Sequence, residues 1–421
     1  MAYAGFTQGA TIPVKNSPPP PTTPPSPTTP PPPTTPPSPP QPAAEPRLTT
    51  DTPPQSPLAI SKISNSKGTH KFTISNAHVS IVNGLRRTIL GHLPTLGMVA
   101  FPEAQTTIRI SQNSSPFHNE LLKQRLACIA FNLHPDDELA GRIEFRLDVE
   151  NTMESEVRLV TVADATLWDS QTEKQLSPEA TRQIFPADPI TGDHALLLVL
   201  QPPVGVTPGG SISLTASLKR VTPNDSGAYA LASTCAYGHV VDIKAREQAR
   251  EAAGISNDAY PRSVWEESVV GQFNIPNTYE FKIRSVGWMN EKQLLRAAAA
   301  HMRTELLAIA ERATNSALNI TKVKDILAQS AFDIEIPGDT YSLGHALRHQ
   351  LYITECGMDY GSQLTLVGFD KKHAHDQNGE LRIVFGREAS VANAFNVVAT
   401  AARQVADIYQ TILKLLPQDS K

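Results

Sequence analysis

Three side chains of the types that bind metals lie close together near the C-terminal end of the chain. The stretch "KKHAHDQNGE" (371–380) contains His373, His375 and Asp376. Imidazole and carboxylate groups are common metal ligands, so a metal-dependent enzyme is one hypothesis. However, the His-x-His pair on this turn between strands has no third ligand at a sequence spacing typical of metal sites. Such clusters usually belong to solvated loops. The spacing therefore favours no metal site.

Patterns for other catalytic chemistry are missing. The sequence contains no Gly-x-Ser-x-Gly, no P-loop and no glycine pattern of a dinucleotide-binding fold. Cys128, Cys235 and Cys356 are far apart and form no CxxC pair, which argues against a disulfide framework and a cysteine-based zinc site. We expect no catalytic residue, no metal and no cofactor.

Composition limits the remaining functions. The net charge of −4 gives no basic field that would attract nucleic acid, and Lys371 and Lys372 are interpreted as solvated surface. We therefore expect no direct contact with DNA at a catalytic centre. The sequence has no run of 18 apolar residues and no signal-peptide pattern, so we expect a soluble protein that is neither membrane-bound nor secreted.

The N-terminal residues 1–57 differ from the rest. They hold more than half of the chain's 36 prolines, with Thr and Ser between them, and almost no large apolar side chain from residue 13 onwards. Such a segment cannot bury enough surface to fold, so we expect a disordered tail with polyproline II character. It could be a spacer, or it could recruit proline-recognising partners, in which case the protein is a free-standing adaptor.

Two adjacent arginines interrupt an apolar run, "SIVNGLRRTI" (80–89). A strand over 71–74 precedes it, and Ser75 or Asn76 is the expected cap of a helix over 77–93. On a helical wheel Arg86 falls inside the apolar face and Arg87 on its flank. A buried arginine costs stability unless its stem reaches solvent or its charge is paired, so Arg86 either reaches the rim or meets a group on another chain.

The middle of the chain predicts an inserted, mostly β domain over residues 141–274. Segments such as "RIEFRLDVEN" and "SISLTASLKRV" alternate in hydrophobicity and are separated by Pro- and Gly-rich turns. A strand over 278–287 then leads into a helix that begins near Glu291.

Two long helices carry apolar stripes of matching length. The first has Leu295, Ala298, Met302, Leu306, Ile309 and Ala313 at helical spacing. The second covers 389–416, spans about 40 Å, and has Val391, Phe395, Val398, Ala402, Val405, Ile408, Ile412 and Leu415 on one side. Strands at 331–339, 362–372 and 379–387 and a helix at 340–353 with Leu343, Leu347 and Leu351 accompany it. Each half needs a partner for its stripe, so the halves should pack together as a pseudo-symmetric dimer does.

The first half resembles the third subunit of eukaryotic RNA polymerase II, the archaeal D subunit and the bacterial alpha N-terminal domain. The resemblance rests on "FTISNAHVSIVNGLRRTILGHLPTLGMVAF", in which Asn83, Leu85, Arg86 and Arg87 match an Asn-x-Leu-Arg-Arg motif. A second segment, "SSPFHNELLKQRLACIAF", matches the family at His118, Glu120, Arg125 and Leu126 and departs from it at Asn119 and Gln124.

The second half resembles the eleventh subunit, or archaeal L. In "YSLGHALR" the matching residues are Leu343, Gly344, Leu347 and Arg348, whereas Ser342 and His345 replace the usual Thr and Asn. Together the two resemblances cover about residues 58–160 and 275–421. The two subunits are separate chains in cells, so a fusion resembles the version that large nucleocytoplasmic DNA viruses encode.

The resemblance implies an α+β fold in which two alpha-like dimerisation units are fused in one chain as a pseudo-heterodimer. The units are expected at 58–140 with 275–318 and at 328–421. It also implies a non-catalytic assembly platform of a DNA-directed RNA polymerase, located in the virion and host cytoplasm if viral and otherwise nuclear or cytoplasmic. Relatives with a cysteine cluster in the insert bind zinc or an iron–sulfur cluster there; this chain has only Cys235 in that region.

The resemblance also implies partners and contact residues. The second-largest polymerase subunit is expected to dock on Asn83, Leu85, Arg86 and Arg87, with a small zinc-bearing subunit like the tenth nearby and the largest subunit in the same complex. The residues expected to join the two units are Leu295, Met302, Leu306, Ile309, Leu343, Leu347, Phe395, Val398, Val405, Ile408 and Ile412.

Overall fold

The computed structural model describes residues 57–66, 68–188, 191–323, 330–338, 340–356, 363–373 and 376–416. The proline-rich tail lies outside these residues except for Pro57, and so does the adaptor hypothesis that depends on it. Helices and antiparallel sheets alternate along the described chain, which confirms the α+β class. No described helix is both long enough and apolar enough to cross a membrane.

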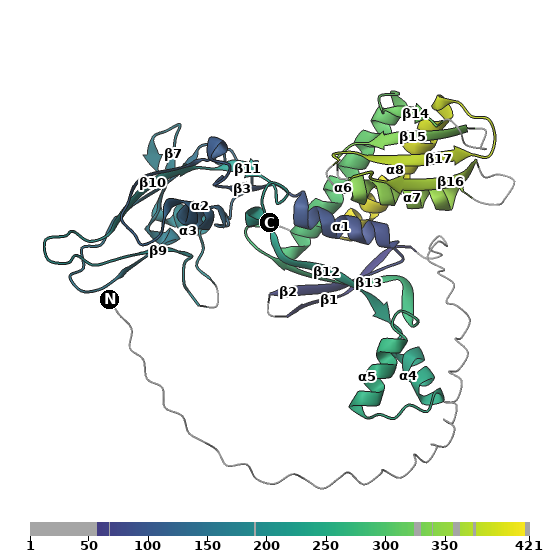
Figure 1. Cartoon of the computed structure of the whole chain (residues 1–421), viewed down its shortest axis with the longest axis horizontal. Coiled ribbons are helices and arrows are strands. Elements are labelled where there is room, and N and C mark those ends of the chain that lie inside the picture. Colours follow the sequence, from purple (N-terminus) through teal and green to yellow (C-terminus); the bar gives the residue numbers. More distant parts are fainter. Residues whose placement is uncertain are drawn as a thin grey trace, which may run out of the picture. The chain divides into compact units, whose positions relative to one another are not determined.

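The first αβ unit consists of a four-stranded antiparallel sheet and two helices (Figure 1). In spatial order its strands are β1 (Ala59–Ser66), β2 (Thr69–Ser75), β13 (Asn274–Ser285) and β12 (Ala232–Val241), and its helices are α1 (Val79–Gly91) and α6 (Glu291–Thr314). Alternate residues of the sheet point towards the helices. Among them, Phe72 on β2 stacks on Phe281 on β13, with ring centroids 5.2 Å apart.

Helix α1 begins later than expected. Its N-cap is His78, whose side chain accepts a hydrogen bond from the backbone N–H of Ser80, and not Ser75 or Asn76. Asn76 instead adopts a φ of +61°, a left-handed conformation that asparagine tolerates in turns. Ser75 and Asn76, which were expected to cap the helix, therefore lie at the end of β2 and in the turn that follows it.

The second αβ unit repeats this order of elements. Its sheet runs β14 (Ile320–Lys322), β15 (Ser330–Ile336), β17 (Gly379–Phe385) and β16 (Leu364–Asp370), and its helices are α7 (Thr340–Glu355) and α8 (Val391–Leu415). All neighbouring strands are antiparallel. Both units thus place the first helix after the second strand and a long helix after the last strand.

The two units share one hydrophobic core. Buried side chains from both sheets and from α1, α6, α7 and α8 form a single cluster. Helices α6 and α8 make the most extensive contact of any helix pair in the described residues. They run antiparallel, because Arg296 near the start of α6 donates to the carbonyl of Leu413 near the end of α8 at 3.0 Å. At the other end Arg403 on α8 donates to the hydroxyl of Thr314 at 2.8 Å.

A β-rich insert has a separate core. Its largest sheet has the order β4 (Ile108–Asn113), β10 (Ser211–Ser217), β5 (Ile143–Glu150), β7 (Thr166–Asp169) and β8 (Lys174–Gln175). Two ribbons pair β6 (Arg158–Thr161) with β9 (Leu196–Leu200) and β3 (Thr95–Gly97) with β11 (Lys219–Val221), and the helices are α2 (Asn119–Ala127) and α3 (Pro178–Ile184).

The insert begins earlier and ends earlier than residues 141–274. Its core extends from Leu96 to Tyr229, because β4 pairs with β10 and must lie in the same sheet. Strand β12, expected in the insert, pairs with β13 and belongs to the first αβ unit. Cys235 therefore lies in that unit.

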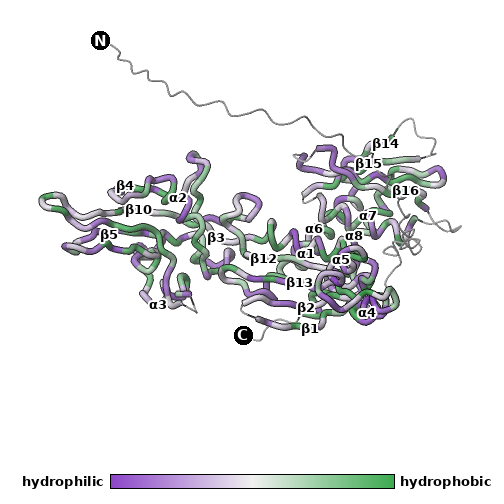
Figure 2. Tube along the Cα trace, turned by 60° about the horizontal axis from the view of Figure 1, so that its bottom comes forward, coloured by the Kyte–Doolittle hydropathy of each residue, from purple (hydrophilic) through white to green (hydrophobic). Residues whose placement is uncertain are grey.

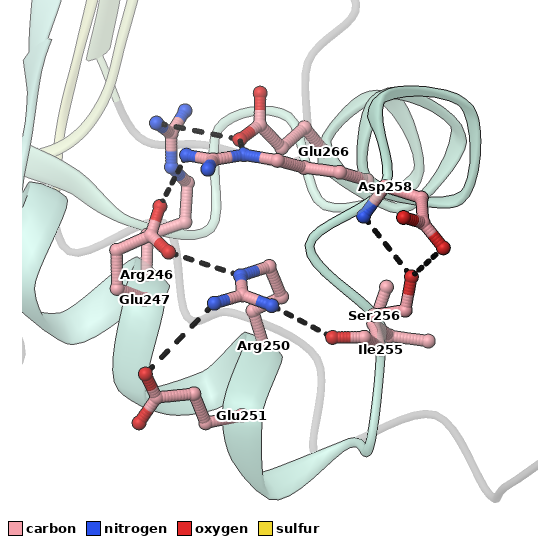
Figure 3. Close-up of polar contacts among 9 residues, drawn as sticks. Arg246, Glu247, Arg250, Glu251, Ile255, Ser256, Asp258 and Glu266 are labelled. Atoms are coloured by element: carbon pink, nitrogen blue, oxygen red, sulfur yellow. Dashed lines mark hydrogen bonds and ion pairs between the residues drawn. The ribbon is translucent and has the colours of Figure 1, made fainter.

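A helical hairpin, α4 (Ile243–Ala252) and α5 (Ala259–Ser268), stands between β12 and β13, inside the range that was expected to form a mostly β domain. Figure 2 shows that the chain around α4 is mainly hydrophilic. The hairpin is organised around Arg250, which is 4 % exposed and donates to Glu247 at 2.9 Å and to the carbonyl of Ile255 at 2.7 Å (Figure 3). Glu247 in turn accepts a hydrogen bond from Arg262 at 2.7 Å, which ties α5 to α4.

A candidate docking surface on helix α1

Helix α1 separates the four residues of its Asn-x-Leu-Arg-Arg segment into different environments. Leu85 is fully buried in the shared core, whereas Asn83, Arg86 and Arg87 are half-buried. The expectation that Leu85 contacts another subunit does not fit this placement, because its side chain offers no surface. The helical period explains the difference, since Leu85 lies on the buried face of α1 and the other three lie at its margins.

Arg86 lies beside β12 without a carboxylate partner. Its Nε donates to Oδ1 of Asn83, one turn earlier on α1, at 3.0 Å. Its charge acts on Cys235 and Tyr237; burial raises the pKa of the Cys235 thiol to about 12, and the Arg86 cation opposes that rise. Within the described residues no Asp or Glu oxygen forms an ion pair with Arg86. A half-buried cation satisfied only by an amide can still accept a stronger anionic or carbonyl partner.

Arg87, by contrast, contacts the second αβ unit. Its Nε donates to the hydroxyl of Ser342 at 3.1 Å, and its guanidinium lies 5.6 Å from the ring centroid of Tyr341. Both residues belong to the start of α7. The two adjacent arginines therefore differ in role, because 100° of helical rotation directs one along β12 and the other towards α7.

A second contact between the units joins the start of α1 to the second half of α7. The imidazole of His78 stacks on that of His349 of α7, with centroids 3.3 Å apart and planes 5° from parallel. His349 is 6 % exposed, and burial together with the nearby Arg348 lowers the pKa of its imidazole to about 4. The ring is therefore neutral at pH 7.

Acid should weaken the junction between α1 and α7. In the unfolded chain the His349 imidazole takes up its proton near its ordinary pKa of 6.5, but in the folded chain only near 4. The free energy of unfolding therefore decreases as the pH falls from 6.5 towards 4, and His349 contributes no pH dependence above that window. We expect it to account for a loss of about 2 kcal/mol between pH 7.5 and pH 5.

Urea unfolding at the two pH values measures this loss. In His349→Phe, which keeps a buried ring against His78, the loss should shrink by about that amount. His134→Gln, at an exposed histidine, is the matched control and should retain the full loss. A His349→Phe variant with the same pH dependence as the unaltered chain would contradict the prediction.

Two glycines allow α1 and α7 to pack closely on neighbouring elements. A Cβ atom at Gly84 of α1 would lie 2.5 Å from Oη of Tyr409 on α8 and 3.2 Å from Cε of Met302 on α6. At Gly344 of α7 a Cβ would overlap the ring of Phe369 on β16. Tyr409 is fully buried, and its hydroxyl donates to the carbonyl of Ile81 at 3.3 Å, so α8 bonds directly to α1.

The residues expected to join the two units are found in the shared core. All are buried except Ile408, which is half-buried: Leu295, Met302, Leu306, Ile309, Leu343, Leu347, Phe395, Val398, Val405 and Ile412. Tyr409, which the stripe analysis missed, takes the inward position next to Ile408. Gly84 and His78 were also missed as contact residues. A glycine inside a helix costs about 1 kcal/mol of stability relative to alanine. The presence of Gly84 within the helical pattern was therefore the one sign in the sequence that another element packs closely there.

The metal hypothesis gains no support from the described residues. Asp376 accepts a hydrogen bond from the backbone N–H of His373 at 2.9 Å, which closes the loop, while His375 lies outside the described residues. In the described ranges no three His, Cys, Asp or Glu side chains gather as metal ligands. Cys128 is exposed, Cys235 buried and Cys356 half-buried, and all three are free thiols.

Comparison with known proteins identifies the family of this fold. The family model described as the RNA polymerase Rpb3/Rpb11 dimerisation domain matches residues 71–306, more than half of the chain's 421 residues. The match begins in β2, includes α1 and the insert, and ends within α6. A search of curated proteins found no match. The chain belongs to the RNA polymerase Rpb3/Rpb11 dimerisation domain family.

Proposed function

We propose that this protein is a non-catalytic assembly platform of a multisubunit DNA-directed RNA polymerase, with two dimerisation units fused in one chain. The family supports the polymerase assignment. The fusion is supported by the repeated sheet order and by the core that the two units share. The second unit lies beyond the family match, so its identity as an eleventh-subunit-like unit rests on this structural repeat and on the "YSLGHALR" motif.

The contacts between α1 and α7 support a pseudo-heterodimer. Arg87 near the end of α1 reaches the start of α7, and His78 before α1 reaches the second half of α7. In one contact the end of α1 meets the start of α7, and in the other the start of α1 meets the later part of α7. A local twofold axis between the two helices would produce such a pair of contacts. A single chain that supplies both halves needs no separate dimerisation step, and this is the form known from large nucleocytoplasmic DNA viruses. If the chain is viral, its place is the virion and the host cytoplasm.

The platform docks the second-largest polymerase subunit on α1, chiefly through Asn83 and Arg86. The observation that carries this proposal is the half-buried Arg86 guanidinium, whose hydrogen bond goes to Asn83 and not to a carboxylate. A partner that supplies a carboxylate or a carbonyl would complete its coordination and desolvate it. A small zinc-bearing subunit like the tenth would dock nearby, and the largest subunit would join the same complex.

Arg86→Ala should weaken this docking while the chain stays folded. Removing one partner of a desolvated charge contact costs about 2 kcal/mol or more, which is a roughly 30-fold loss of affinity. The measurement is titration of the full chain with the separately purified second-largest subunit, followed by light scattering or interferometry. Arg387→Ala, at an exposed arginine in the second unit, is the matched control.

Unchanged affinity in Arg86→Ala, with a far-UV spectrum and melting curve like those of the unaltered chain, would contradict the role of Arg86. Loss of binding in Arg387→Ala as well would point to a general charge effect and also contradict it.

A further inference from the structure

The outer face of the first sheet carries a concentration of positive charge. Residues of β2, β12 and β13 that alternate with the core-facing ones point away from the helices. On this face Lys71 of β2 lies directly opposite Lys282 of β13, and Lys282 lies opposite Ala236 of β12. Like charges directly opposite on neighbouring strands destabilise a sheet. The sheet therefore bears a repulsion that an acidic partner would relieve.

The carboxylates on this face do not neutralise it. Lys282 has one ion pair, with Glu280 at 3.7 Å. In the described residues Lys62 and Lys71 have no ion pair, and neither does the exposed Arg284. Lys62 stands at the irregular part of β1, with a φ of +52°. In the part of the chain that the structure describes, Lys62, Lys71, Lys282 and Arg284 thus outnumber Glu280, the one carboxylate that pairs with any of them.

A hollow of about 620 Å³ lies beside these lysines. Its floor includes Ala236 and Gly238 of β12, one wall is formed by Ile243 and Arg246 of α4, and Lys62, Glu280 and Lys282 also line it. A Cβ atom at Gly238 would meet nothing within 4 Å, so the floor is open. Strand β12 is at the end of the sheet order, and its outer side has no strand partner among the described residues.

We propose that this hollow binds an acidic, extended segment of a partner polypeptide. Lysines around small residues suit carboxylate side chains, and an edge strand offers backbone groups to an extended chain. Nucleic acid fits less well, because its sugar–phosphate backbone cannot continue the strand pairing that the edge of β12 offers to an extended polypeptide. The inference goes beyond docking on α1, and its test uses no polymerase subunit.

The test measures fluorescence anisotropy of a labelled deca-glutamate peptide against the full chain at low salt. Lys71→Gln combined with Lys282→Gln should weaken binding about tenfold. Gly238→Leu, which fills the hollow from an open position, should weaken it by a similar factor. Lys174→Gln combined with Lys219→Gln, at exposed lysines of the insert, should bind the peptide as the unaltered chain does.

Folding is checked by thermal melting, and the Lys71→Gln, Lys282→Gln variant should melt close to the unaltered chain, since the loss of the like-charge pair offsets the loss of the exposed Lys282–Glu280 ion pair. Equal peptide affinity in all variants overturns the proposal. It is also overturned if Gly238→Leu binds normally, or if a labelled 20-nucleotide single-stranded DNA binds more tightly than the peptide and responds to the same substitutions.

Discussion

Met302→Asp should prevent the two αβ units from folding around their shared core. Met302 is 1 % exposed, and its Cε lies close to Gly84 of α1, next to the position that Tyr409 of α8 occupies. A carboxylate there would lack a partner and would have to be buried as an unpaired charge or kept protonated at neutral pH. We expect the free energy of unfolding to fall by about 4 kcal/mol or more, which is a large part of the stability of an ordinary domain.

Urea unfolding followed by far-UV circular dichroism measures this change. Ala300→Asp, at an exposed position two residues earlier on α6, introduces the same group and should change the stability by less than about 1 kcal/mol. The insert has its own core, so part of the β signal should survive in Met302→Asp. Similar effects of the two substitutions would show that α6 is not buried as described.

Gly84→Ala should destabilise the chain, and Tyr409→Phe should remove most of that effect. The added Cβ would lie 2.5 Å from the hydroxyl oxygen of Tyr409 but 3.8 Å from the ring carbon that carries it. Overpacking of this kind costs about 1–3 kcal/mol, and the higher helix propensity of alanine offsets about 1 kcal/mol of that cost. Phenylalanine at position 409 has no hydroxyl, so the remaining contact with the ring is an ordinary one.

The four proteins of this cycle form a double-mutant test of the contact between α1 and α8. We expect the coupling free energy between Gly84→Ala and Tyr409→Phe to exceed about 1 kcal/mol. The double variant should be less destabilised than the sum of the two single variants' effects. Asn396→Ala, at an exposed position of α8, serves as a control for changes in helix stability. Purely additive effects would mean that Tyr409 does not pack on Gly84 and that the two units are not joined at this point.

The long helices could be predicted from the sequence because their stripes are strong and unbroken. The sequence predicts two long amphipathic helices that pack on each other, since each apolar stripe needs an equally long partner. The stripes include Leu295, Met302 and Leu306 on α6, and Val398, Val405 and Ile412 on α8. The short helix α1 could be placed as well, but its cap could not. Asparagine is common both as a helix cap and in turns, and Asn76 adopts a turn conformation. Which of the two roles it takes depends on the tertiary path of the chain.

The extent of the insert could not be predicted, because its strands pair over long sequence separations. Strand β4 belongs to the insert because it pairs with β10, and β12 belongs to the first αβ unit because it pairs with β13. The hairpin α4–α5 was missed for another reason. Its helices have few apolar residues and depend on ion pairs around Arg250, so periodicity gave no signal there.

The candidate docking surface was partly predictable for similar reasons. The wheel placed Arg86 inside the apolar face and Arg87 on its flank, but it contains no information about neighbouring elements. Arg87 finds its contacts on α7, about 255 residues later, whereas Arg86 stays beside β12 with Asn83. Sequence spacing could identify the pair of arginines, and only the fold could show that Arg87 contacts α7 whereas Arg86 bonds to Asn83 on its own helix.

The central claim is that α6 and α8 close on each other, antiparallel, inside one polypeptide. Electron–electron double resonance tests it most directly, with spin labels at exposed Ala300 on α6 and at either exposed Thr411 or exposed Val391 on α8, in a background without Cys128 and Cys356. The account predicts a narrow, short Ala300–Thr411 distance and a clearly longer Ala300–Val391 distance, because about 30 Å of helix α8 separates Val391 from Thr411. Broad distributions for both pairs, or an Ala300–Val391 distance equal to or shorter than the other, would contradict it.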